Sequence, residues 1–153
     1  MFIDGSLLRL DSSKIEKKDF YIFIFDIKDS KKLIQYWGET KFFNFYIKIF
    51  SEIFNYISVL SQYYQTRFFI KNLGDGLIIL IYSSPNKALE NNLVEFCQTL
   101  TTKYPLKGLI SWETLTCFDF SNQNIFIECW GRTLNKMFSN LKTIETCKVL
   151  INS

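Results

Sequence analysis

Residues 19–26 read Asp-Phe-Tyr-Ile-Phe-Ile-Phe-Asp, a run of aromatic and β-branched residues with an aspartate at each end. Such residues favour the extended conformation, and a run without polar alternation is typical of a strand that is buried on both faces. The segment therefore predicts a strand that is buried on both faces and ends on Asp26.

The sequence on the C-terminal side of this strand alternates between helix and strand patterns. Pro85, which follows the candidate caps Ser83 and Ser84, is expected to open a helix whose buried stripe runs to Leu100. The other expected elements are a lead-in over 1–18, helices over 30–37, 39–64 and 132–142, and strands over 66–71, 77–82, 106–115, 124–130 and 147–151. The order β-α-β-β-α-β followed by β-α-β predicts a single α+β domain over 1–153, with a ferredoxin-like palm core and an added βαβ unit.

Residues 72–76, which separate two of these strands, read Asn-Leu-Gly-Asp-Gly and predict a β-hairpin turn. In a ferredoxin-like sheet the first strand lies beside this hairpin, so Asp26 and Asp75 are expected to meet. Converging carboxylates repel each other unless a cation neutralises them. Mg²⁺ prefers oxygen ligands and is usually bound by one or two carboxylates together with substrate phosphates. Together the two residues predict a site for a metal-bound nucleoside triphosphate. Taken singly, Asp75 is also a common turn former and Asp26 a possible strand-end cap.

The composition narrows the chemistry that the chain can perform. It contains no histidine, which excludes Ser-His and Cys-His catalysis and nearly all zinc enzymes of the usual kind. Its four cysteines include no CxxC pair, so structural zinc is disfavoured and reduced thiols in or near the core are expected. Any reaction must therefore run on carboxylates, Lys, Arg, Asn, hydroxyls, thiols or a bound metal.

Charge and hydropathy give no indication of a nucleic-acid or membrane partner. The net charge of +3 comes without a long basic cluster. The longest apolar runs are far shorter than the ~20 residues of a membrane span, and the N-terminus lacks the features of a signal peptide. A cytoplasmic protein is expected.

Three stretches, in the same order along the chain, resemble the class III nucleotidyl cyclases, the family of adenylyl and guanylyl cyclase catalytic domains. Residues 25–30, Phe-Asp-Ile-Lys-Asp-Ser, resemble the family's Asp-Ile-x-x-Ser segment. Residues 71–76, Lys-Asn-Leu-Gly-Asp-Gly, are similar to its Lys-x-x-Gly-Asp-Gly hairpin. Residues 128–135, Glu-Cys-Trp-Gly-Arg-Thr-Leu-Asn, resemble its Asp-x-Trp-Gly-x-x-Val-Asn. The ordered set implies the cyclase fold and a metal-dependent cyclisation of a nucleoside triphosphate, with release of pyrophosphate.

The resemblance also implies roles for individual residues. Asp26 and Asp75 would hold two ions, Mg²⁺ or Mn²⁺. The residues that would bind the substrate are Lys71 and Glu128, which contact the base, together with Ile27, Ser30 and Gly74. The family works as a dimer with its site between subunits, so a homodimer is expected in which one chain supplies the metal carboxylates and the other supplies Lys71, Glu128 and Asn135.

The catalytic residues that the resemblance implies lie within the third motif or shortly after it. Asn135 would position the ribose and the transition state. The family's usual Arg, four residues later, is Ser139 here, so Arg132, Lys136 or Lys142 would have to supply the positive charge. The pair of Lys71 and an acidic residue at 128 resembles the adenine type, while small standalone domains of this kind also resemble the bacterial antiphage cyclases that make cyclic CMP or cyclic UMP.

Two other functions remain open from the sequence. A palm-domain enzyme on the same core would join nucleotides into cyclic oligonucleotides, and the Gly-Asp-Gly turn resembles the Gly-Gly-Asp-Asp turn of such enzymes without its second aspartate. A catalytically degenerate cyclase homologue would bind a nucleotide or a partner without turnover, and Ser139 is the residue that suggests it.

Overall fold

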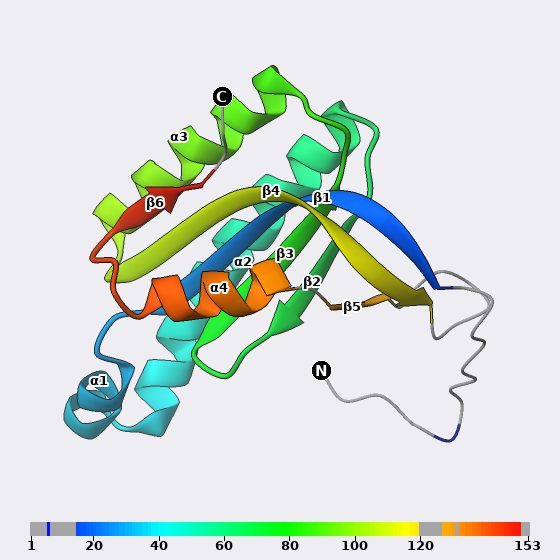
Figure 1. Ribbon diagram of the computed structural model, residues 1–153. Coiled ribbons are helices and arrows are strands. Elements are labelled where there is room, and N and C mark those ends of the chain that lie inside the picture. The colour runs from blue at the N-terminus through cyan, green and yellow to red at the C-terminus, as the bar shows by residue number, and fades with distance from the viewer. Residues whose placement is uncertain (1–5, 7–14, 120–126, 131, 151–153) are drawn as a thin grey trace.

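The protein folds as one twisted sheet with helices on both of its faces (Figure 1). The structure is a computed structural model, and it describes Ser6 and residues 15–119, 127–130 and 132–150. The elements are, in chain order, β1 (Ile15–Ile27), α1 (Ser30–Trp37), α2 (Glu39–Tyr63), β2 (Phe68–Asn72), β3 (Gly76–Tyr82), α3 (Lys87–Lys103), β4 (Leu106–Asp119), β5 (Ile127–Trp130), α4 (Arg132–Leu141) and β6 (Cys147–Val149).

The order of the strands in space confirms the ferredoxin-like core. The path runs β2-β3-β1-β4-β5, with neighbouring strands antiparallel, and β6 pairs in parallel with β4. Strand β1 lies centrally, between β3 of the hairpin and β4. The last strand, helix and strand, β5-α4-β6, form the added βαβ unit, so the predicted fold class is correct.

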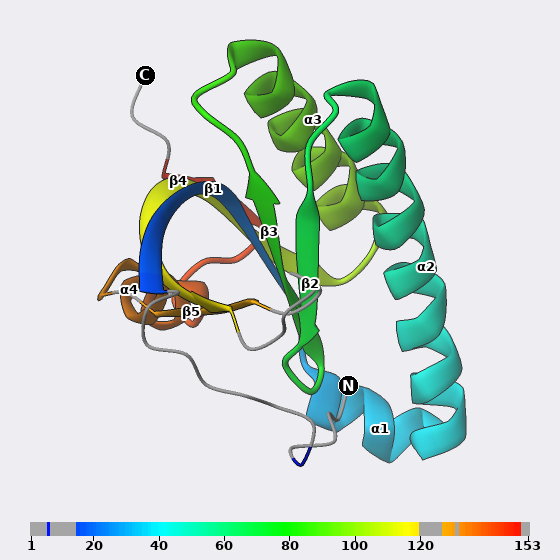
Figure 2. The same ribbon diagram turned by 90° about the vertical axis from the view of Figure 1, so that its right-hand side faces the viewer.

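Strand β1 is buried on both faces, as its sequence predicts. Side chains 20–25 are each at most 2% exposed. Tyr21, Phe23 and Phe25 belong to the core under α2 and α3, whereas Phe20, Ile22 and Ile24 belong to the core under α4. Figure 2 shows α2 and α3 on one side of the sheet and α4 on the other. Strand β1 therefore packs against both helix layers, and its last residues lie where both cores end.

Strand β1 begins earlier than the sequence predicts, so the expected lead-in over 1–18 is too long. It starts at Ile15, which pairs with Phe118 because β4 continues past the expected end at 115 to Asp119. Residues 15–17 are exposed and lack the apolar pattern by which a buried strand is recognised. Cross-strand pairing, rather than burial, extends the strand here. The expected strand ends at 124–126 and at 151 lie outside the described residues.

Helix α3 is capped by Asn86 and not by the expected Ser83 or Ser84. The Asn86 side chain accepts a hydrogen bond from the backbone N–H of Leu89 at 3.1 Å. The backbone N–H of Asn86 donates to the hydroxyl of Tyr21 at 2.9 Å. A tertiary contact with β1 thus fixes the residue at which the helix begins. In the described ranges, no helix is both long enough and apolar enough to cross a membrane.

Candidate functional site

The turn that carries Asp75 is shaped by its own residues and by a tyrosine of α2. Asn72 Oδ1 accepts a hydrogen bond from the Gly74 N–H at 2.8 Å, and Gly74 has a φ of +85°, which glycine adopts without strain. The Tyr46 hydroxyl accepts from the Asn72 amide and lies 3.4 Å from the carbonyl oxygen of Gly76. The turn is therefore anchored to the helix layer, and Asp75 is presented from a fixed backbone.

The hairpin turn lies beside the end of β1, and this brings the two predicted carboxylates together. Asp26 pairs with Gly76 across the β1–β3 ladder. The Ile27 N–H donates to the Asp75 carbonyl at 3.2 Å, and the Ser30 hydroxyl, at the start of α1, donates to the Asp75 carboxylate. Four of the residues expected at the site from sequence, with Gly74 in the same turn, therefore form one cluster.

Gly76 makes the close approach of turn and strand possible. A Cβ at this position would overlap the carbonyl oxygen of Phe25 and lie 3.4 Å from Asp26 Oδ1. Any other residue would push the hairpin away from β1. The second glycine of the Gly-Asp-Gly motif thus sets the separation between the two carboxylates.

Burial and the neighbouring Asp75 carboxylate change the ionisation of Asp26. The pKa of Asp26 is raised from an ordinary value of 3.8 to about 6, first by burial and further by the charge and hydrogen bond of Asp75. Lys107, which faces Asp26 on β4, and the Ile27 N–H act in the opposite direction but do not cancel it. The pair is thus short of positive charge, which is the condition that a bound cation relieves.

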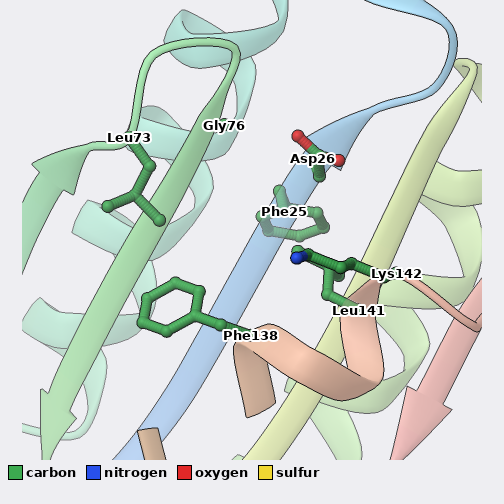
Figure 3. A pocket seen from close by; sticks show the side chains of 7 residues that line it. All are labelled: Phe25, Asp26, Leu73, Gly76, Phe138, Leu141 and Lys142. Carbon is green, nitrogen blue, oxygen red and sulfur yellow. The ribbon is translucent and has the colours of Figure 1, made fainter. Parts of the chain in front are cut away.

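A cavity of about 230 Å³ opens on the α4 side of this pair. Asp26 lies in its wall, and Lys142, directly after α4, extends toward β1 on the same side (Figure 3). Among the described residues Lys142 has no hydrogen-bond or ion-pair partner, so its charge is not neutralised by Asp26. The remaining lining residues are Phe25, Leu73, Gly76, Phe138 and Leu141. The cavity therefore has acidic and basic groups in an otherwise mainly apolar wall.

The donor set of the cluster fits Mg²⁺ or Mn²⁺. Asp26 and Asp75 offer carboxylate oxygens only, which hard divalent ions prefer to nitrogen or sulfur. No group of three or more His, Cys, Asp or Glu side chains that could hold a metal occurs in the described part of the chain. The pair therefore suits an ion that shares its coordination with water and substrate phosphates rather than a closed structural site.

Four of the other residues expected at the site are exposed and do not line this cavity in the same chain. Arg132, Asn135 and Lys136 are exposed on the first half of α4, whereas the α4 residues that line the cavity come from its second half. Lys71 is exposed on β2, opposite Ile78 of β3. Glu128 lies on β5, whose side chains are outside the described part of the structure, at the opposite end of the strand path from β2. Within one chain, the exposed α4 residues thus lie outside the cavity that adjoins the carboxylate cluster.

Known proteins resemble this chain in structure but not detectably in sequence. No protein-family model matches the chain, and no curated protein matches its sequence. The adenylyl cyclase CyaB of P. aeruginosa superposes with a TM-score of 0.60 at 15% identity over 90% of this chain and 78% of that one. A double mutant of the guanylyl cyclase domain of the RhoGC fusion protein of the aquatic fungus Blastocladiella emersonii superposes with a TM-score of 0.65. The identity is 11%, over 89% of this chain and 81% of that one. The catalytic core of a rhodopsin-guanylyl cyclase with converted specificity, in complex with ATPαS, superposes with a TM-score of 0.62. The identity is 10%, over 90% of this chain and 80% of that one.

The chain has the fold of a nucleotidyl cyclase catalytic domain. Within this cyclase fold the carboxylate pair has two positively charged neighbours, of which the sequence motifs missed Lys107 and named Lys142 only as one of three candidates for the positive charge. Lys107 faces Asp26 only because of the β1–β4 register, and Lys142 reaches the cavity only because of how α4 packs on the sheet. The supporting role of Tyr46 follows from its place on the buried stripe of α2, which the helical periodicity does reveal.

Proposed function

We propose that this chain is a metal-dependent nucleotidyl cyclase, which converts a nucleoside triphosphate into a 3′,5′-cyclic nucleotide and pyrophosphate for signalling. The observation that carries the proposal is the contact of Asp26 with the Asp75 turn at the end of β1, in the cyclase fold. The reaction is an internal phosphoryl transfer, in which the ribose 3′-oxygen attacks the α-phosphorus in line. Positioning and electrostatics dominate such a reaction, so the absence of histidine is compatible with it.

Asp26 and Asp75 would hold the metal ions. When bound, Mg²⁺ or Mn²⁺ supplies charge neutralisation at the triphosphate and a lower pKa at the attacking hydroxyl. The hydrogen bond from the Ser30 hydroxyl fixes the direction of the Asp75 carboxylate, and the Ile27 N–H fixes the turn behind it. These two contacts keep the ligand oxygens in place, which limits reorganisation when the substrate binds.

The cavity beside Asp26 would accept part of the triphosphate. Lys142 places an unpaired ammonium there, and a phosphate bound between this ammonium and the metal would contact positive charge on both sides. The apolar side chains of Leu73, Phe138 and Leu141 restrict water at this point, which strengthens electrostatic attraction. Lys142 would therefore stabilise the negative charge of the leaving pyrophosphate, at a position other than Ser139.

A second copy of the chain would complete the site. Arg132, Asn135 and Lys136 are exposed on α4 and face away from the core formed by its buried residues, so they are available to a partner molecule. We propose a homodimer in which these residues, with Lys71 and Glu128, serve the carboxylate pair of the other chain. No nucleic acid or membrane is part of this proposal.

The dimer proposal has a direct test in mixed variants. Asp75→Asn and Asn135→Ala are each expected to be inactive alone, since each removes a different half of both sites. Mixing equal amounts should restore about one quarter of the wild-type rate, because half of the dimers are mixed and each mixed dimer has one intact site. An absence of restored activity, with subunit exchange verified by mass spectrometry, would place both residues in one chain's site.

The identity of the base is left to a screen of substrates. Lys71 with Glu128 favours adenine, and the likeness to antiphage cyclases favours a pyrimidine product. The protein is incubated with each of ATP, GTP, CTP and UTP and with Mg²⁺ or Mn²⁺, and the products are identified by mass spectrometry. A cyclic mononucleotide with pyrophosphate supports the proposal. Products larger than a mononucleotide would favour a cyclic oligonucleotide synthase, and thermal stabilisation by a nucleotide without turnover would favour a degenerate homologue.

A further inference from the structure

Cys97 on α3 and Cys147, the first residue of β6, meet between the helix layer and the sheet. Their Sγ atoms lie 2.8 Å apart, Cys97 is fully buried and Cys147 is half-buried. Both are free thiols. A disulfide has an S–S length of about 2.05 Å, so the sulfurs need to approach by only about 0.8 Å to bond. The fold thus pairs two cysteines that their spacing in the sequence does not connect.

A glycine of β4 makes room for this pair. Gly108 lies opposite Cys147 in the β4–β6 ladder, and its N–H donates to the Thr146 carbonyl at 2.7 Å. A Cβ at residue 108 would overlap the Sγ atom of Cys97. The thiol of Cys97 therefore lies against bare backbone of β4, directly beside the residue that starts β6.

The contact makes the two thiols chemically unequal. The contact with Cys97 lowers the pKa of Cys147, because it stabilises the Cys147 thiolate. The same contact with Cys147, together with burial, raises the pKa of Cys97. The thiolate is the nucleophilic form of cysteine. Cys147, which is also the more accessible of the two, is thus the thiol that an oxidant meets first.

We propose that Cys97 and Cys147 are an oxidation site, which hydroperoxides convert into a disulfide between α3 and β6. In the first step the Cys147 thiolate attacks the peroxide O–O bond, forms a sulfenic acid and releases hydroxide. In the second step Cys97 sulfur displaces the sulfenic hydroxyl group as water, and the S–S bond forms. The two thiols are oxidised, one hydrogen peroxide is reduced, and two waters are the net products.

The position of the pair gives the disulfide a structural consequence. Among the described residues, strand β6 pairs with β4 at residues 108–110 only, so few hydrogen bonds hold it there. It follows α4 closely in the chain, and the second half of α4 with Lys142 forms one wall of the cavity beside Asp26. A bond from Cys147 to α3 would fix the βαβ unit to the ferredoxin-like core. Oxidation is therefore expected to stabilise the wall of the cavity, whatever the chain catalyses.

The experiment uses hydrogen peroxide on the intact, folded protein, followed by mass spectrometry and thermal unfolding. Cys117 and Cys129 lie opposite each other in the β4–β5 ladder, so a variant with C117S and C129S isolates the proposed pair, and the wild type is mapped in parallel by digestion without reduction. Loss of two hydrogens and a linked peptide that contains residues 97 and 147 are expected. For a loop of this length, the melting temperature should rise by about 10 °C and return on reduction with dithiothreitol.

The Cys147→Ser variant is the matched control, and it should show neither the linked peptide nor the rise in melting temperature. The inference is overturned if peroxide leaves both thiols open to alkylation in the wild type, or if Cys147 proceeds to sulfinic acid with Cys97 still free. A linked peptide from any other pair of cysteines would also overturn it. No nucleotide enters the experiment, so its result does not depend on the proposed cyclase activity.

Discussion

Replacing Asp26 by asparagine should make the protein more stable at neutral pH while removing its proposed metal site. Burial and the neighbouring Asp75 carboxylate raise the pKa of Asp26 from 3.8 to about 6, so the folded state disfavours the ionised form. At 1.36 kcal/mol per pKa unit this rise corresponds to about 3 kcal/mol, and because Asp26 is only half-buried, solvent screening reduces it to about 1–2 kcal/mol. The ionised pair therefore costs stability that a bound cation would restore.

The pH window follows from the direction of the shift. Below pH 3.8 Asp26 is protonated in both the folded and the unfolded state, so the cost is absent. Between pH 3.8 and about 6 the folded state binds more protons than the unfolded state, and stability from this group falls as the pH rises. Above pH 6 the cost is fully present. The gain from Asp26→Asn should thus be small at pH 4 and largest above pH 7.

The assay is thermal unfolding of wild type and Asp26→Asn from pH 4 to pH 7.5, in buffer with EDTA. We expect the variant to melt about 4 °C higher at pH 7.5, since about 1–2 kcal/mol shifts the midpoint of a chain of this size by a few degrees. Asp19→Asn is the matched control, because Asp19 lies on the same strand, accepts a hydrogen bond from Thr114 and is remote from Asp75. A difference between variant and wild type that does not change with pH, or a variant that is less stable than wild type at pH 7.5, would refute the reasoning.

Three further substitutions test the parts of the site separately. Gly76→Ala should lower the free energy of unfolding by about 2–3 kcal/mol in a urea titration, because the added Cβ overlaps a carbonyl oxygen of β1. An unchanged urea midpoint would show that the hairpin can move away. Asn86→Ala should cost about 1 kcal/mol in the same titration through loss of the α3 cap, and a cost equal to that of Ser84→Ala would contradict the assignment. Lys142→Ala should weaken the binding of Mg²⁺-triphosphate, measured by calorimetry, at least tenfold (about 1.5 kcal/mol). Lys48→Ala, at an exposed position on α2, is the control. Equal affinities for the two variants would exclude Lys142 from the site.

Much of the architecture follows from local patterns in the sequence. The unbroken apolar run that ends on Asp26 predicts a strand buried on both faces, and the Gly-rich gap at 72–76 predicts the hairpin turn. The order of elements then determines that the end of β1 and the turn meet. These three inferences suffice to bring Asp26 and Asp75 together, because each depends on short-range periodicity or on topology.

The features that the sequence did not reveal depend on tertiary contacts. The polar start of β1 at Ile15 is extended by pairing with the far end of β4, which no local pattern indicates. The cap of α3 is decided by the Tyr21 hydroxyl, which lies on another strand. The contact of Cys97 with Cys147 and the approach of Lys142 to the cavity depend on how the βαβ unit packs on the core. Register and packing, rather than propensity, determine these details.

The most direct test of the proposed function compares turnover by three proteins at equal concentration. Wild type, Asp75→Asn and Asp19→Asn are incubated with each nucleoside triphosphate and Mn²⁺, and cyclic mononucleotide is quantified by mass spectrometry. We predict a cyclic product from at least one triphosphate, a loss of about 100-fold or more in Asp75→Asn, and a rate within about twofold of wild type in Asp19→Asn. A wild type that forms no cyclic mononucleotide from any triphosphate, or an Asp75→Asn variant as active as wild type, would contradict the assignment of the carboxylate pair to cyclase chemistry.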